Sequence, residues 1–498
     1  MSVVRRLTLI FTLLIVFLLV AVPQSAPAQE QPPINQMRAF WADTYHDGFR
    51  NHPQVDALVE TVARAGGNTI IMQVRRHGDA WYNQSFEPHA VEPSLAPAAE
   101  FDPLQYMLDK AHSMGIKVHA WIVLGPVCPA SDPVTQQPTH VCVTHGPRIA
   151  DPERWTTATF SGKQVSDLDF GHPSAVQYLE RVVQNLLQNY PSLDGIHWDY
   201  VRYAGPEYGY NQVSIDRFNG AYNRPGGSRP DPYDPLWAQW RRDRVTEVVR
   251  RLYIRSKAIN PQIQVSAATI TWGGAGSETP ESWPKSAAYG RVFQDWRAWL
   301  EEGILDFAVP MHYFAEGKPQ QRDWYNSWLA WDHQHTGKRA IVPGMGAWLN
   351  NADEVMAQTQ RALAPDATGQ TLAGVAFYSY DQPLRGGGNA PRRAFADRLR
   401  NEIFAPPAVA PQWPWMTNPT TGMIQGIATI DGQVMPSAAI MLIRDGVWQS
   451  DLTAAVDGWY GAVELPPGNY TVIIRDPANS ERTNVQQLLV VPGHVASA

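Results

Sequence analysis

The sequence predicts an α/β fold, a (β/α)8 TIM barrel followed by a small all-β sandwich domain. Between residues 37 and 402, short apolar segments alternate eight times with amphipathic stretches, which is the pattern of strands that are each followed by a helix. Beyond residue 421 the apolar residues recur at every second position, between turn-forming dipeptides such as Asp431-Gly432 and Asp457-Gly458. The second pattern is typical of antiparallel strands.

The elements of the barrel follow from the apolar periodicity. We expect strands at 37–45, 68–76, 117–124, 193–203, 264–270, 305–313, 339–349 and 374–381, and helices near 53–65, 102–114, 173–190, 235–259, 291–302, 320–332, 351–363 and 391–402. In the third helix Val176, Leu179 and Val183 recur at three- and four-residue steps, after a proline suited to the first turn. A doubly wound open sheet is the alternative, but no G-x-G-x-x-G turn follows the first strand.

The two ends of the chain differ from the barrel in composition. Residues 1–28 are expected to be a secretory signal peptide, because two arginines precede an apolar run and Ala26-Pro27-Ala28 offers a cleavage site. The protein is then secreted or extracytoplasmic, in the periplasm or at the cell surface. An uncleaved signal that acts as a loose membrane tether is the alternative. Residues 403–421, rich in Pro and Trp, are expected to be a linker, and 422–498 the sandwich.

Composition excludes several functional classes. The chain has 498 residues, a net charge of −7 and 44% hydrophobic residues, so it is neither disordered nor a basic nucleic-acid binder. Cys128 and Cys142, the only cysteines, lie in a Pro- and Thr-rich stretch and are expected to form one disulfide in an oxidising compartment. A pair of zinc ligands is the alternative. The 19 Trp and 19 Tyr residues suit stacking on sugar rings, although core packing uses the same side chains.

The candidate site residues are those at the carboxyl ends of the predicted strands, where barrels of this kind carry their chemistry. Asp199 lies within the fourth predicted strand, and a carboxylate there needs either a partner, such as Arg202 or Arg75, or a catalytic role. Asp43 and Asp381 end the first and eighth strands, while Glu278 and Glu316 lie in loops after the fifth and sixth. Gln73 and Arg75 alternate with Val74, so both are expected to face the mouth.

Several motifs in this order resemble the bacterial glycosyl-hydrolase-like family 10. They are Gln73-Val74-Arg75, Gly78-Asp79-Ala80, Asp102-Pro103-Leu104, Ala111-His112, His119-Ala120-Trp121, Asp169 to Pro173 and Asp194 to Tyr200. The resemblance spans residues 37–402 and implies a TIM-barrel glycosidase of the bacterial envelope with Asp199 as its leading catalytic carboxylate. The chain departs from the family where Ile122-Val123 replaces the usual Asn-Pro, where Met311 replaces Gln, and in having one Asp at 199 where many relatives have two in succession. The run Asp457-Gly458-Trp459-Tyr460 resembles carboxypeptidase regulatory-like domains.

Glycosidic bond cleavage needs one carboxylic acid and a second carboxylate, which matches this set of residues. Asp199 is expected to be the nucleophile or base, and Asp381, Glu316 and Glu278, in that order, the proton donor. Sugar-binding residues are expected to be Asp43, Gln73, Arg75, His119, Trp121, His197, His312, Tyr313 and Trp348, with no cofactor. The alternatives are a non-catalytic carbohydrate-binding barrel and a metal-dependent amidase or deacetylase that uses His197, Asp199 and His312. The metal alternative is disfavoured because H-E-x-x-H and a first-strand H-x-H are absent.

Overall fold

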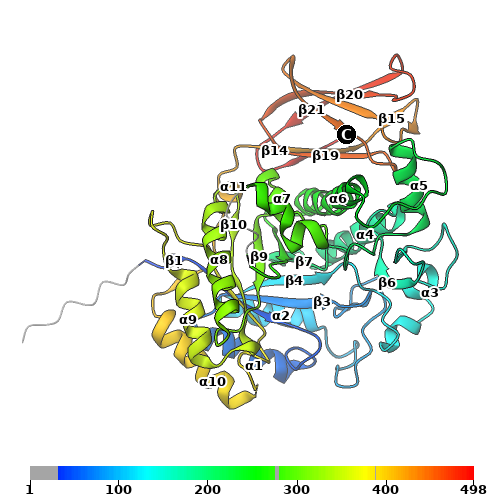
Figure 1. Cartoon of the computed structure of the whole chain (residues 1–498). Coiled ribbons are helices and arrows are strands. Elements are labelled where there is room, and N and C mark those ends of the chain that lie inside the picture. Colours follow the sequence, from blue (N-terminus) through cyan, green and yellow to red (C-terminus); the bar gives the residue numbers. More distant parts are fainter. Residues whose placement is uncertain (1–31, 275–279, 387) are drawn as a thin grey trace, which may run out of the picture.

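The computed structural model describes residues 32–274, 280–386 and 388–498 (Figure 1). The signal peptide expected at residues 1–28 and the candidate Glu278 lie outside the described residues.

Eight parallel strands close into a barrel, which confirms the predicted fold. The strands are β2 (Met37–Ala42), β3 (Thr69–Arg75), β4 (Lys117–Val123), β7 (Gly195–Asp199), β8 (Gln264–Thr269), β9 (Phe307–His312), β10 (Ala340–Ile341) with β11 (Gly344–Gly346), and β12 (Gly374–Tyr378). The short β10 and β11 both pair with β9 and together take the place of the seventh strand. Pairing of β12 with β2 and of β8 with β9 closes the sheet, so the open-sheet alternative is wrong.

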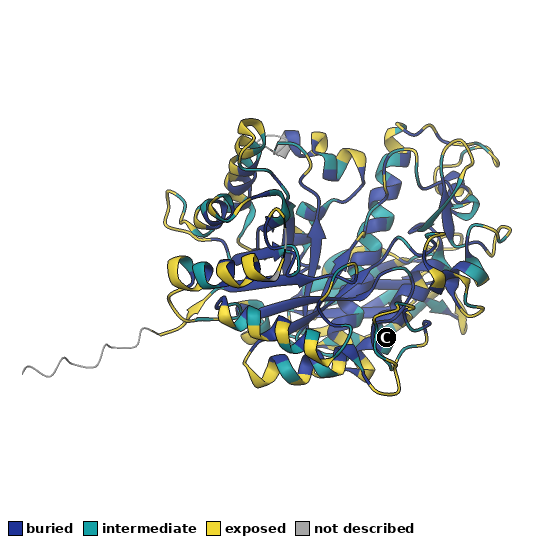
Figure 2. Cartoon of the chain, turned by 90° about the horizontal axis from the view of Figure 1, so that it is seen from below, coloured by how far each residue is buried: buried dark blue, intermediate teal, exposed yellow. Residues whose placement is uncertain are grey.

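The barrel helices surround the sheet and begin where the sequence predicts. They are α1 (His52–Arg64), α2 (Pro103–Ser113), α4 (Pro173–Asn189), α6 (Pro235–Ile259), α7 (Trp296–Glu302), α8 (Pro319–His335), α9 (Ala352–Leu363) and α10 (Asn389–Arg398). Asp102 and Asp234 each accept two backbone N–H bonds at a helix start, and each precedes a proline that needs no such bond. Figure 2 shows the resulting layers, with buried strands inside and exposed outer helix faces.

The loops after β4 and β7 are long and carry extra elements. They hold α3 (Val141–His145), the hairpin of β5 (Thr156–Ala158) with β6 (Gln164–Leu168), and α5 (Gln212–Ala221). The hairpin forms isolated bridges to both loops, from Asp167 to Pro126 and from Thr159 to Tyr208. These loops therefore build up one side of the barrel mouth.

The predicted linker is part of the packed barrel. β1 (Ile34–Asn35) pairs with β13 (Ala408–Val409), and α11 (Pro414–Thr417) follows. Trp413 is buried in the cluster that fills the barrel lumen, among Met37, Phe307 and Ala340. The Trp415 indole donates to Asp306 Oδ1 (2.9 Å). Since these contacts lie at the amino ends of the strands, the segment closes the floor of the barrel.

Two small sheets form the C-terminal part of the chain. One has the order β19-β14-β22 and the other β18-β17-β20-β21, beside a short β15–β16 ribbon. The bounds are β14 (Gly422–Ile427), β15 (Thr429–Ile430), β16 (Gln433–Val434), β17 (Ala439–Arg444), β18 (Val447–Thr453), β19 (Trp459–Leu465), β20 (Gly468–Arg475), β21 (Thr483–Val490) and β22 (Val495–Ser497). One apolar core joins residues of both sheets, consistent with a sandwich. The resemblance to carboxypeptidase regulatory-like domains stays a prediction.

The C-terminal sheets sit against α6 and α7 (Figure 1) and are held by ion pairs. Arg251 on α6 donates to Asp457 (2.8 Å) and lies over the ring of Trp459, 4.6 Å from its centre. Arg339 pairs with Glu464 (2.5 Å). Burial alone raises the pKa of Asp457, but the Arg251 hydrogen bond and charge lower it to about 2.

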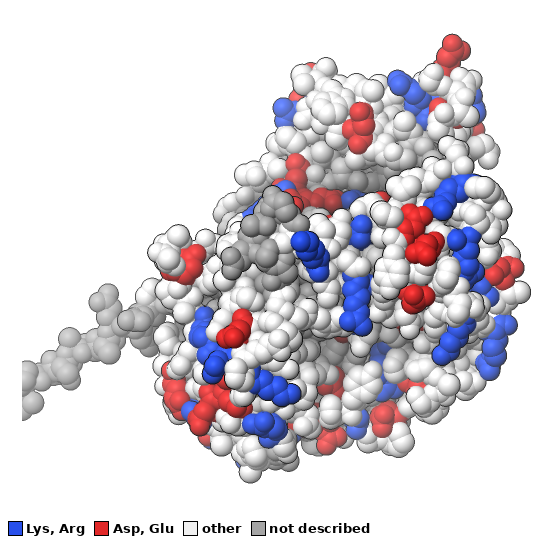
Figure 3. Space-filling model, viewed as in Figure 1, with Lys and Arg blue, Asp and Glu red and all other residues white. Residues whose placement is uncertain are grey.

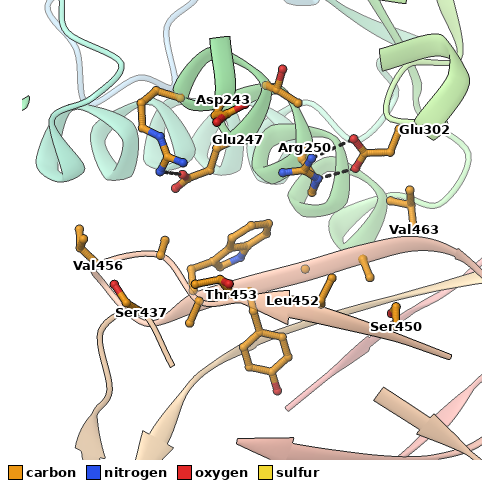
Figure 4. Close-up of a pocket in the computed structure, with 18 of the residues that line it drawn as sticks. Asp243, Glu247, Arg250, Glu302, Ser437, Ser450, Leu452, Thr453, Val456 and Val463 are labelled. Atoms are coloured by element: carbon orange, nitrogen blue, oxygen red, sulfur yellow. Dashed lines mark hydrogen bonds and ion pairs between the residues drawn. The ribbon is translucent and has the colours of Figure 1, made fainter. Parts of the chain in front are cut away.

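A groove of about 1270 Å³ runs between α6 and the C-terminal sheets (Figure 4). Its charged side chains pair with each other, Arg244 with Glu247 and Arg250 with Glu302. None of its lining residues belongs to the strand ends at the barrel mouth. On the face shown in Figure 3, acidic and basic side chains are interspersed. Among the described residues, no helix has both the length and the apolar character needed to cross a membrane.

Removing the Trp413 side chain should destabilise the barrel. We expect Trp413→Ala to lower the free energy of unfolding by about 3–5 kcal/mol, because it leaves a cavity at the floor of the lumen. Urea unfolding of the full chain measures this. Trp448→Ala is the control, since that indole is 58% exposed on β18. Equal losses in the two variants would show that Trp413 does not close the floor.

The Arg251–Asp457 pair should make stability depend on acid. The pKa of Asp457 is lower in the folded chain than its ordinary 3.8, so the stabilisation is full above about pH 5 and is lost as the pH falls through about 2. Asp457→Asn should therefore lower the free energy of unfolding at pH 7 by about 2 kcal/mol, and by less at pH 3. Urea unfolding at both pH values, with the exposed Asp451→Asn as control, checks this. A loss that is the same at both pH values would contradict it.

Candidate active site

Asp199 lies at the centre of the barrel mouth, at the last position of β7. Its side chain is buried; Oδ2 accepts from the Trp121 indole (3.1 Å) and Oδ1 from the Tyr200 amide (2.7 Å). Burial raises the pKa of Asp199, and the charge of Arg202 with these two hydrogen bonds offsets only part of that. None of these contacts is an ion pair, so the structure does not place Asp199 as a partner of Arg75.

The chain turns immediately after Asp199. Tyr200 has a φ of +52°, in the left-handed region that is uncommon for a residue with a side chain. The turn leaves the Tyr200 ring 41% exposed at the rim, under the guanidinium of Arg202, which lies 4.4 Å from the ring centre. The carboxylate and an exposed aromatic face are thus adjacent.

Aromatic rings from five of the eight barrel strands, or from the turns that follow them, surround the mouth above the lumen. Tyr378 on β12 contacts Tyr313 after β9 (5.7 Å between ring centres) and Trp348 in the turn after β11 (5.4 Å). It also contacts Trp41 and Trp121, each at 6.1 Å. The structure therefore brings together the predicted Trp121, Tyr313 and Trp348.

Asp43 joins this group from the loop after β2. Its Oδ1 accepts from the amides of Tyr45 (3.0 Å) and His46 (3.1 Å) and lies 2.8 Å from the His46 ring nitrogen. Its buried Oδ2 has no hydrogen-bond partner among the described residues. Burial raises the pKa of both Tyr313 and Tyr378, and the charges of Asp43 and Asp199 act in the same direction. Both carboxylates are therefore close enough to raise the pKa of these two tyrosines.

His119 and His197 are placed in the lumen rather than at the mouth. His197 uses both ring nitrogens, one with Ser266 Oγ (2.9 Å) and one as acceptor from the Trp41 indole (3.2 Å). The His119 ring packs against Gly195, where a Cβ would come within 2.5 Å of it. Burial lowers the pKa of His197 to about 3 and that of His119 to about 4, so both are neutral packing residues. Both histidines lie on the inner face of the barrel, as predicted, but deeper in the lumen than expected.

His312 faces the helices instead of the mouth. Its Nε2 lies 2.7 Å from Asp332 on α8, and both side chains are fully buried. The inward position belongs to its neighbour Tyr313, since side chains alternate along a strand. Because His312 points outward and the nitrogens of His197 are occupied, the structure does not assemble the metal set of His197, Asp199 and His312.

A register shift separates Gln73 from Arg75. Gln73 pairs with Trp121, while Arg75 pairs with the next residue, so a bulge at Val74 ends the expected alternation. Gln73 Oε1 accepts from the Thr44 amide (2.9 Å) and hydroxyl (2.8 Å), which fixes the loop that carries Asp43. Arg75 turns away from the mouth and pairs with the buried Glu87 (2.8 Å), which also accepts from Tyr178. Glu87 could not be predicted as the partner of Arg75, because it lies 12 positions further along the chain, outside the strand.

Two of the predicted proton donors are held by arginines. Arg392 on α10 donates to Asp381 Oδ1 (2.6 Å), and Arg361 on α9 donates to Glu316 Oε2 (2.6 Å). Each carboxylate is thus the ion-pair partner of a helix arginine rather than an unpaired group at the mouth. These arginines come from helices distant in sequence, which strand periodicity cannot reveal.

Cys128 and Cys142 are free thiols in the structure, so the expected disulfide is not present in it. Both are buried and adjacent, and the Cys128 thiol, with His140 and Arg148 nearby, lowers the pKa of Cys142. The two side chains are therefore neighbours, as predicted, but not bonded covalently.

Several residues at the rim of the mouth were not predicted from the sequence. Tyr45 and Trp272 are exposed there, with Arg76 over the first ring (5.5 Å) and Arg202 and Arg291 over the second (5.5 and 5.3 Å). Each follows the end of a strand by two or three residues, and that position was the available signal. Asp167 on β6 was missed because its strand lies inside a long loop.

Breaking the Arg75–Glu87 pair should affect stability and spare the mouth. We expect Glu87→Gln to lower the free energy of unfolding by about 3–5 kcal/mol, because it leaves the buried Arg75 charge without its partner. Thermal or urea unfolding measures this, and the exposed Glu207→Gln is the control. Unchanged stability would show that the pair is not a structural tie.

Several known proteins are similar to this chain. The sequence model of the family described as "Glycosyl hydrolase-like 10" matches residues 36–339. Glycosyl hydrolase DigH of Escherichia coli K12 is 26% identical over 328 residues, which are 59% of this chain and 70% of that protein. Glycosyl hydrolase YngK of Bacillus subtilis 168 is 22% identical over 390 residues, 72% of this chain and 68% of that protein.

Among solved structures, the glycoside hydrolase domain of PgaB (BpsB) from Bordetella bronchiseptica aligns with a TM-score of 0.47 at 14% identity, over 70% of this chain and 95% of that one. The family match itself covers more than half of the chain. The chain therefore belongs to the glycosyl hydrolase-like 10 family.

Proposed function

We propose that this protein hydrolyses glycosidic bonds in a cell-wall or extracellular polysaccharide, with Asp199 as nucleophile or as base for water. The observation that carries the proposal is a buried carboxylate at the centre of an aromatic-walled barrel mouth, without an ion-pair partner among the described residues. A carboxylate there stabilises the positive charge that develops on the sugar ring in the transition state.

The surrounding residues suit a chain of sugar rings. Trp121 orients Asp199 through its indole N–H, while its ring and that of Tyr378 offer apolar faces to a sugar. Tyr45, Tyr200 and Trp272 extend the aromatic surface along the rim, beyond a single ring.

We also propose that the chain is exported. The charged residues, apolar run and Ala26-Pro27-Ala28 of the first 28 positions support this. Export would bring the barrel to extracellular or cell-wall glycan. Mass spectrometry of the protein recovered outside the cytoplasm, with a mature N-terminus at Gln29, is the test.

The activity is tested by the release of reducing ends from purified polysaccharides: bacterial cell-wall glycan strands, chitin, cellulose and mannan. Release from at least one of them is expected. Binding to a glycan without any release would favour the non-catalytic carbohydrate-binding barrel instead.

Asp199→Asn separates catalysis from structure. We expect the rate on the cleaved glycan to fall at least ~10³-fold, about 4 kcal/mol of barrier, because the amide carries no negative charge. The melting temperature should stay the same or rise, since burial of the carboxylate is unfavourable. Asp381→Asn is the matched control, with a lower melting temperature and near-normal turnover per folded molecule. A folded Asp199→Asn protein with normal turnover would remove Asp199 from the chemistry.

A further inference from the structure

Among the described residues, the two carboxyl groups predicted to donate the proton, Asp381 and Glu316, are both tied to arginines. An acid for this step has to be a carboxyl group that faces the mouth, stays protonated near neutral pH and has no ion-pair partner. Asp43 does not fit, because two backbone amides and His46 already occupy its Oδ1 and its Oδ2 is buried.

The β5–β6 hairpin brings another carboxyl group to the same side of the mouth as Asp199. The amide of Leu168 on β6 donates to Gly125 O (2.8 Å), and that of Val127 donates to Ser166 O (3.0 Å). Gly125 in turn lies against the residue after Asp199, since a Cβ built on it would be 3.0 Å from Tyr200 O. β6 is therefore separated from the end of β7 only by the segment that follows β4.

The side chain of Asp167 lies beside the segment that follows Asp199, since both Tyr200 and Arg202 interact with it electrostatically. Leu168 packs into the core between sheet and helices, so alternation along β6 directs its neighbour to the opposite side. Asp167 is half-buried and accepts one long hydrogen bond from the Ser166 hydroxyl (3.4 Å). It forms no ion pair within the described part of the chain, and burial raises its pKa, partly offset by Ser166 and Arg202.

Arg202 connects Asp167 electrostatically with Asp199. Its charge acts on both carboxyl groups, and its guanidinium lies over the Tyr200 ring between the two loops. The titratable or charged groups that face Asp167 are Arg202 and Tyr200 from the segment after β7, and Cys128 from the loop after β4. Arg202 is thus placed to stabilise the negative charge that Asp167 acquires when it releases a proton.

We propose that Asp167 is the general acid that protonates the leaving glycosidic oxygen, opposite Asp199. This inference rests on the proposed glycosidase function. The bond between the anomeric carbon and the glycosidic oxygen breaks, and its electron pair stays on the oxygen, which takes the proton of Asp167. The anomeric carbon bonds either to an Asp199 oxygen, later displaced by a water whose proton returns to Asp167, or directly to a water oxygen whose proton passes to Asp199. Both routes consume one water.

The dependence on the leaving group tests this role. The wild type, Asp167→Asn, Asp167→Glu and Asp199→Asn are compared on the polysaccharide that is cleaved and on the 2,4-dinitrophenyl glycoside of the released sugar. Dinitrophenolate leaves without protonation. The activity of Asp167→Asn should therefore fall at least ~10²-fold on the polysaccharide and less than ~10-fold on the aryl glycoside. The activity of Asp199→Asn should fall on both substrates. The ratio of the two activities within one preparation does not depend on the fraction of folded protein.

The pH profile is the second readout. A required acid makes kcat/KM fall as the pH rises through its pKa, so this alkaline limb should disappear in Asp167→Asn and return in Asp167→Glu. Glu316→Gln, which removes an ion-paired carboxylate, is the control and should keep the limb. Equal losses of Asp167→Asn on both substrates, or the leaving-group effect in Asp43→Asn instead, would overturn the role of Asp167 while the glycosidase function stands. A wild type inactive on every polysaccharide would overturn both.

Discussion

Closure of eight parallel strands is the constraint on which the site depends. Once β8 pairs with β9, every strand ends at the same face, and the lumen beneath is filled by side chains. The parallel register sets Trp121 beside His197 and Val123 beside Asp199. An indole at 121 therefore reaches the carboxylate at the end of the next strand. The buried, neutral His119 and His197 pack below these rings, and the Trp41 indole donates to His197, so the mouth residues have little freedom to rearrange.

Most motif residues of the family are structural ties in this chain. Asp79 accepts from two backbone amides and the Trp81 indole, and Asp102 caps α2. Asp169 accepts from Tyr203, Ser214 and the Gly171 amide. Asp194 pairs with His112 and Lys117 at the amino end of the barrel. These bonds fix the scaffold, which explains how the order of motifs indicates the fold, while Asp199 alone among these aspartates lies at the centre of the mouth.

The strands and helices of the barrel could be predicted because each has an apolar period and most helices begin at a capping residue or proline. The direction of individual side chains was less accessible. A bulge at Val74 turned the Arg75 side chain away from the mouth. The outward His312 and the inward Tyr313 differ by only one position along the chain. The arginine partners of Asp381 and Glu316 come from helices packed there only in the folded chain. Periodicity within one strand contains none of this information.

The energetics of Asp199 are the strongest reason to connect it with chemistry rather than stability. A buried carboxylate whose pKa is raised costs folding free energy at neutral pH, since the unfolded chain solvates the charge better. Asp457 and Asp194 show the opposite case, where a cation lowers the pKa and the pair stabilises the fold. Asp199 and Asp167 share the unfavourable environment, and both lie within the reach of one arginine. Two carboxyl groups in such surroundings at the mouth of a barrel cost folding free energy, which is the pattern expected of catalytic rather than structural residues.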